Sequence, residues 1–135
     1  MAEDEGFALH DEEHYISKIA YPHLLFIQMQ SIMDTIRAGG SGWEELENLK
    51  ALLKPSWRRE IDESLKELKK RLPERLKLAE RWRGRFGTVS VHEAKRRIIV
   101  EYVRAYVQKV VEKLDEVGLL LEERYKVLRG GGVVE

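Results

Sequence analysis

The C-terminal third of the chain, from residue 88 to 129, carries the pattern that most restricts the fold. Ser90 and Glu93 have the spacing of a helix capping box. Behind this cap, apolar residues fall on two rows at helical spacing, whereas a surface helix needs a single stripe a little over 100° wide. One row is Ile99, Val103, Tyr106, Val110, Leu114 and Val117, and the other is Ile98, Tyr102, Ala105, Val107 and Val111. A helix with both rows needs cover on two sides, which predicts a helical bundle that self-associates.

Three further helices are predicted upstream. The first spans about residues 11–38, bends near Pro22 because proline lacks an N–H, and ends at Gly39 and Gly40. Its apolar residues after Pro22 fall on one face at steps of four, three and four, namely Leu25, Met29, Ile32 and Ile36. A second capping box, Ser41 to Glu44, opens a short helix that stops before Pro55.

The stripe that follows comprises Trp57, Ile61, Leu65, Leu68 and Leu72. It predicts a helix over 56–86, either kinked near Pro73 or built of two nearly collinear pieces. Gly118 is the expected break in the last helical pattern. The predicted fold class is therefore all-α, a four-helix bundle whose long helices are kinked near Pro22 and Pro73.

Length and composition indicate one intracellular domain. The 135 residues suit a single core, which we place at 11–129 between an acidic flexible tail at 1–10 and a flexible tail at 130–135. The absence of cysteine excludes disulfides, thiolate catalysis and Cys-based zinc sites. The start is acidic and no long apolar run occurs, so we expect a cytoplasmic protein without a membrane span. Abundant Lys, Arg and Glu, with few Asn and Gln, favour a thermophilic source.

Motifs for catalysis or cofactor binding are missing. No nucleophile elbow, P-loop or dinucleotide-binding glycine pattern occurs, and the stretch 39–42 lacks the Lys-Ser/Thr of a phosphate loop. His10 and His14 have the spacing of two metal ligands on one helix face, but they lie at the edge of the acidic tail. We therefore expect no enzyme activity, no metal and no cofactor.

Charge is unevenly distributed although the net charge is zero. Residues 1–53 carry −7 and residues 54–87 carry +6, which predicts either internal pairing between these segments or a nucleic-acid surface. The candidate phosphate contacts are Arg58, Arg59, Lys69, Lys70, Arg81, Arg83 and Arg85. Arginines alternate with Trp82 and Phe86 as in binders of single strands, yet Glu60, Asp62, Glu63 and Glu67 would repel phosphates.

The run from Trp43 to Arg58, which contains Leu49-Lys50-Ala51-Leu52-Leu53-Lys54-Pro55-Ser56, resembles small helical proteins of unknown function from viruses and plasmids of hyperthermophilic archaea. Some of those proteins are dimeric four-helix bundles. This run is 16 of the 135 residues, and the resemblance implies a mobile-element protein that acts through protein contacts.

Two functions follow from these patterns. The preferred one is a non-enzymatic interaction or structural module that forms a homodimer through its C-terminal helix and binds another protein. Its candidate interface residues are Tyr102, Val103, Tyr106, Val107, Val110 and Val111. The alternative is a nucleic-acid-binding accessory protein that uses the basic segment 54–87.

Overall fold

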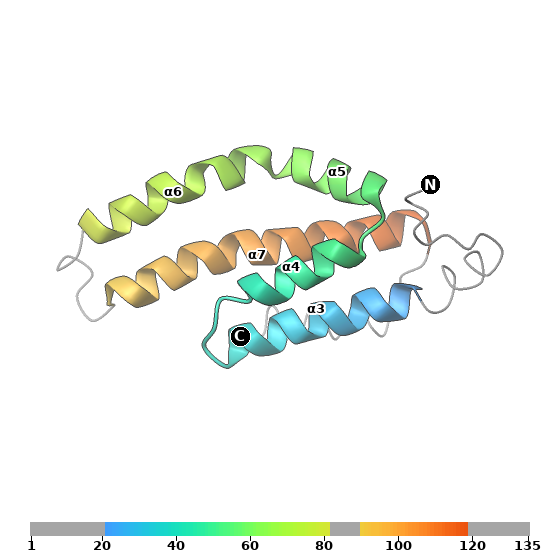
Figure 1. Ribbon diagram of the computed structural model, residues 1–135, viewed down its shortest axis with the longest axis horizontal. Helices are drawn as coiled ribbons and strands as arrows, with labels where there is room; N and C mark the ends of the chain where they lie inside the picture. The colour runs from blue at the N-terminus through green and yellow to red at the C-terminus, as the bar shows by residue number, and fades with distance from the viewer. Residues whose placement is uncertain (1–20, 82–89, 119–135) are drawn as a thin grey trace.

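The computed structural model describes residues 21–81 and 90–118, and these residues are all-α, with five helices and no strand. The helices are α3 (Tyr21–Arg37), α4 (Trp43–Leu52), α5 (Pro55–Ser64), α6 (Lys66–Arg81) and α7 (Val91–Glu116). Helix α7 contacts each of the other four, and α5 and α6 form an arch along it (Figure 1). The all-α fold class is confirmed, and α7 is its central helix.

The best-buried part of the core lies between α3, α4 and the middle of α7. Leu25, Met29 and Ile32 of α3 are fully buried, as are Leu46 and Leu49 of α4. From α7, Val103, Tyr106 and Val110 meet them in one apolar cluster. The spacing of four, three and four that predicted an inward face on α3 is therefore confirmed from Leu25 to Ile36.

The start of α3 is tied to the connection between α4 and α5. Tyr21 donates its hydroxyl hydrogen to the Leu52 carbonyl at 2.9 Å and accepts a hydrogen bond from the Lys54 N–H at 2.9 Å. Pro22 occupies the second position of α3, where a helix tolerates the missing N–H. The bend predicted near Pro22 involves residues before Tyr21, which lie outside the described residues.

Helix α4 begins at Trp43, and its N-cap is Gly42 rather than the predicted Ser41. Gly42 has a left-handed backbone, with φ of 80°. A Cβ there would lie 3.3 Å from Ile32 Cγ2 and 3.4 Å from Val103 Cγ1. Close packing of the turn against α3 and α7 therefore requires glycine at this position, and the capping box predicted for α4 was wrong.

The predicted helix over 56–86 is interrupted at Leu65 in the described part, and α6 continues through Pro73. Ser64 donates its hydroxyl hydrogen to the Ile61 carbonyl at 2.9 Å, so a side chain competes for a helical acceptor beside the break. Pro73 is exposed, and the Lys69 carbonyl that loses its usual partner belongs to an exposed residue. The described part therefore contains two consecutive helices, one of the two alternatives predicted, but they are divided at Leu65 and not at Pro73.

Helix α7 begins and ends as its sequence predicts. Ser90 is its N-cap, and the Ser90 hydroxyl accepts a hydrogen bond from the Glu93 N–H at 3.0 Å. Gly118 follows the last turn with φ of 73°. Within the described segments, no helix has both the length and the apolar character that crossing a membrane requires.

Candidate functional site

The six residues that the sequence offers as a dimer interface are buried inside a single chain. Tyr102, Val103, Tyr106, Val107, Val110 and Val111 are each at most 7% exposed. Trp43 of α4 packs on Tyr102 with ring centroids 5.7 Å apart, and Asp62 of α5 accepts a hydrogen bond from Tyr106. Both apolar rows of α7 are thus covered mainly by its own chain, because helices lie on more than one side of it. Self-association itself stays a prediction.

The basic candidates lie on the outside of α5 and α6. Arg58, Arg59, Lys69, Lys70 and Arg81 are all exposed, while Arg83 and Arg85 lie outside the described residues. Four exposed cations follow one face of α6 at steps of four, seven and four, namely Lys66, Lys70, Lys77 and Arg81. This row extends about 22 Å at the helical rise of 1.5 Å per residue.

Several carboxylates of the same segment point toward α7 instead. Glu60 forms an ion pair with Lys113, and Glu80 forms one with Lys95 at 2.5 Å. Asp62 accepts the Tyr106 hydroxyl hydrogen at 2.9 Å. The repulsion of phosphates that the sequence suggested is therefore reduced for Glu60 and Asp62, and the basic charge of the outer face is less compensated than the sequence implies.

Two acidic residues remain near the outer row of α6. Glu67 and Glu74 are exposed and form no ion pair with another described residue, and Glu63 pairs locally with Lys66 at 3.8 Å. Between described helices, the ion pairs join α7 to α5 or α6, including Arg75 to Glu101 at 2.8 Å. The internal pairing expected between the acidic N-terminal half and the basic segment is not found among the described residues.

A buried polar cluster between α4, α5 and α7 has no counterpart in the sequence analysis. The Lys50 side chain is 6% exposed, and its Nζ lies 3.7 Å from Glu47 Oε2 and 5.4 Å from the centroid of the Tyr106 ring. No hydrogen bond of this ammonium group occurs within the described part of the chain. Burial raises the pKa of Tyr102 to about 12, with the Asp62 and Glu47 charges adding to the effect.

The same cluster keeps Tyr106 protonated. Its pKa is raised chiefly by burial, and then by the hydrogen bond that its hydroxyl donates to Asp62. A protonated phenol beside a carboxylate is a stable donor and not a base. The cluster thus orients α5 on α7, and a lysine within an otherwise amphipathic helix gives no sequence signal of such burial.

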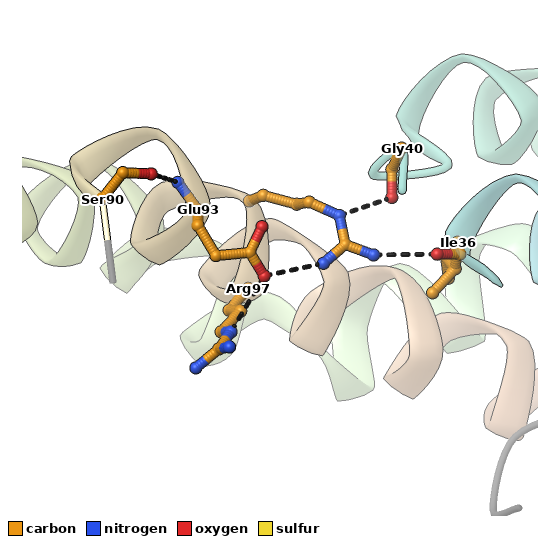
Figure 2. A network of polar contacts seen from close by, with 6 residues as sticks. Ile36, Gly40, Ser90, Glu93 and Arg97 are labelled. Atoms are coloured by element: carbon orange, nitrogen blue, oxygen red, sulfur yellow. Dashed lines mark hydrogen bonds and ion pairs between the residues drawn. The ribbon is translucent and has the colours of Figure 1, made fainter. Parts of the chain in front are cut away.

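The first turns of α7 carry a second polar network (Figure 2). Arg96 donates from Nε to the Gly40 carbonyl at 3.0 Å and from Nη2 to the Ile36 carbonyl at 2.8 Å. Its Nη1 reaches Glu93 Oε2 at 3.1 Å, and the Nε of Arg97 reaches the same oxygen at 3.0 Å. A side chain from α7 thereby ties down the last turn of α3 and the turn that follows it, in addition to the backbone hydrogen bond that the Ile36 carbonyl accepts from Gly39.

Glu93 therefore serves two arginines, whereas a complete capping box would use its side chain on the Ser90 N–H. The hydrogen bond from Arg97 and the charges of both guanidinium groups hold the pKa of Glu93 below its ordinary value. One carboxylate faces two cations here, so this end of α7 keeps an excess of positive charge.

The described residues contain no group of three side chains arranged to hold a metal ion, and His10 and His14 lie outside them. Comparison with family models, curated proteins and solved structures found no match. The most specific functional feature of the described residues is the distribution of exposed charge on α5 and α6.

Proposed function

We propose that this protein is a non-catalytic nucleic-acid-binding accessory protein that contacts phosphates through the outer face of α5 and α6. The observation that carries the proposal is the separation of charge on these helices. Glu60, Asp62 and Glu80 have partners on α7, whereas the five described basic candidates of this segment are exposed. We rank this function ahead of self-association because the six candidate interface residues of α7 are buried within a single chain.

The proposed binding is electrostatic and independent of base sequence. Lys and Arg that neutralise phosphates release condensed counterions, so affinity falls steeply as salt rises. The row of Lys66, Lys70, Lys77 and Arg81 lies along one helix face and can follow a phosphate backbone. Glu67 and Glu74 beside this row limit the affinity, so we expect dissociation constants of about 10⁻⁶ to 10⁻⁴ M at physiological salt.

The test is fluorescence anisotropy with labelled single-stranded and duplex DNA at low and moderate salt. The variant Lys70→Gln, Lys77→Gln and Arg81→Gln should bind at least tenfold more weakly at low salt and show a salt dependence shallower by about two to three contacts. The matched control replaces Arg37, Arg104 and Lys109 by Gln, which removes the same charge elsewhere. Equal weakening by both variants, or no binding by the native protein at low salt, contradicts the proposal.

Self-association is a second candidate function, and one observation favours it. Leu24 and Ile27 are each 44% exposed and lie three residues apart on α3. Light scattering coupled to size exclusion at tens of micromolar should then give a dimer, and Leu24→Glu with Ile27→Glu should give a monomer. A monomeric native protein argues against a homodimer, and a dimer that survives both changes excludes this face of α3.

The finer architecture and origin are also proposals. We infer a four-helix bundle in which α5 and α6 together act as one bent helix beside α3, α4 and α7. The bundle and the segment 43–58 are consistent with a virus or plasmid protein of a hyperthermophilic archaeon. A thermal unfolding midpoint above about 90 °C supports that origin, and one in the mesophile range of about 45–65 °C contradicts it.

A further inference from the structure

A hollow of about 450 Å³ lies where the first turns of α7 meet α6 and the turn between α3 and α4. Its volume falls within the range of about 300–1,000 Å³ that is typical of small-molecule sites. Leu76 of α6 and Ile99 of α7 contribute apolar surface, and both are only partly exposed. His92, Lys95 and Arg96 line the same hollow.

The charges around the hollow do not cancel. Lys95 pairs with Glu80, while Arg96 and Arg97 share the single carboxylate of Glu93. The two other contacts of Arg96 are to neutral carbonyl oxygens, which satisfy its N–H groups without offsetting its charge, so Arg96 has only its half-share of the Glu93 carboxylate within the described residues. Counting Arg97, which does not itself line the hollow, three cations at this end of α7 face two carboxylates.

Two features of α7 add to this excess. The N-terminal end of this 26-residue helix contributes the positive end of its dipole, which is worth most within the first turn. His92 lies in that turn and contributes further ring nitrogens. An anionic group is thus favoured at the rim, and the apolar surface beside it distinguishes the site from one suited to a bare phosphate.

We propose that this hollow binds a small amphipathic anion, with a carboxylate, phosphate or sulfonate group at His92 and Lys95 and an apolar body against Leu76 and Ile99. The site is separate from the outer row of α5 and α6, and it goes beyond the proposed nucleic-acid function. Arg96 holds the turn that forms one wall, whereas His92 and Lys95 make no hydrogen bond to that turn.

The probe is 1-anilinonaphthalene-8-sulfonate, which joins an aryl body to a sulfonate, and its fluorescence is titrated against the native protein. We expect saturable binding of one probe per chain. The uncharged analogue N-phenyl-1-naphthylamine and inorganic phosphate should each bind at least tenfold more weakly, because each lacks one half of the proposed ligand.

Variants locate the binding on the molecule. His92→Gln with Lys95→Gln should weaken probe binding at least fivefold, and Leu76→Trp, which fills the hollow, should abolish it. Arg104→Gln removes an exposed cation about nine residues along α7 and should leave the affinity unchanged. Near-UV circular dichroism and the thermal midpoint verify that each variant is folded.

The opposite results overturn the proposal. They are equal binding of the uncharged analogue, binding that survives Leu76→Trp in a folded variant, or a native protein that does not bind the probe. Loss of DNA binding in the α6 triple variant with probe binding intact would separate this site from the nucleic-acid surface.

Discussion

Different interactions hold the neighbouring helices on the two sides of α7. Toward α3 and α4, the interface is apolar and fully buried, with Leu25, Ile32, Leu46 and Leu49 at 0% exposure. Toward α6, only Leu72 and Ala79 of that helix are buried, and ion pairs such as Arg75 to Glu101 lie beside them. One side is therefore held mainly by apolar burial, and on the other side the outer face of α6 stays charged and exposed.

Truncating one core leucine on each side of α7 should give the largest difference in stability between the two interfaces. Leu46→Ala should lower the free energy of unfolding by about 3–5 kcal/mol, because the site is completely enclosed. Leu72→Ala, at 7% exposure on the peripheral helix, should cost about 2–3 kcal/mol. Urea denaturation measures both, and a larger loss for Leu72→Ala would contradict the ranking of the two interfaces.

Alkaline pH should weaken the α3–α4 side through its tyrosines. Burial raises the pKa of Tyr21 and of Tyr102 to about 12, against 10.0 for an unperturbed tyrosine. The unfolded chain loses these protons first, so the stabilisation is complete below pH 10 and is lost as pH rises to about 12. Each tyrosine then accounts for about 2 kcal/mol of the loss.

Stability measured by urea denaturation between pH 9 and 12 checks this prediction. Tyr102→Phe should flatten the decline because it removes one titrating group. An equally steep decline in that variant would show that Tyr102 does not contribute.

Substitution in the turn before α4 tests how closely α3 and α4 pack against α7. Gly42→Ala should cost about 2–3 kcal/mol, because it combines a left-handed backbone with contacts to Ile32 and Val103. Gly118→Ala has a similar φ but meets nothing within 4 Å, and it should cost about 1 kcal/mol. Thermal melts of the two variants measure the difference, which is the contribution of packing at Gly42. Equal losses of stability would mean that this contribution is negligible.

The two arginines that share Glu93 provide a matched pair. Arg96→Gln removes two hydrogen bonds to the carbonyls of Ile36 and Gly40 and should cost about 1–2 kcal/mol. Arg97→Gln removes only an exposed contact to Glu93 and should cost less than about 0.5 kcal/mol. Chemical denaturation measures both losses of stability. Similar losses for the two variants would mean that Arg96 does not hold the α3–α4 turn.

Removing one charge on each side of α7 should change the free energy of unfolding least. The sign of that change should differ between the two sides. Lys50→Met replaces a buried ammonium that lacks a hydrogen bond to any described residue, so stability should be unchanged or higher by about 1 kcal/mol. Arg75→Met breaks a partly exposed pair with Glu101 and should cost about 0–1 kcal/mol. A marked loss for Lys50→Met would reveal that its contacts with Glu47 and Tyr106 stabilise the fold.

Local sequence patterns were sufficient to predict those features that depend only on residues close together in the chain. The cap at Ser90, the break at Gly118 and the buried face of α3 from Leu25 to Ile36 were predicted because capping and helical periodicity act within a few residues. The break expected near Pro73 lies at Leu65 instead. Helix α6 continues through Pro73, because a proline on an exposed helix face can be accommodated.

By itself, the sequence determined that the described chain is helical, that α7 has two apolar sides, and that residues 54–81 are rich in basic charge. Only the tertiary structure decided that α7 is covered mainly by its own chain, and that Glu60, Asp62 and Glu80 find partners on α7 while Lys70 and Arg81 form no ion pair with a described residue. The physical reason is that periodicity is a short-range property of one helix. Which helix covers an apolar face, and which carboxylate meets a cation, depends on contacts between residues that are distant in the chain.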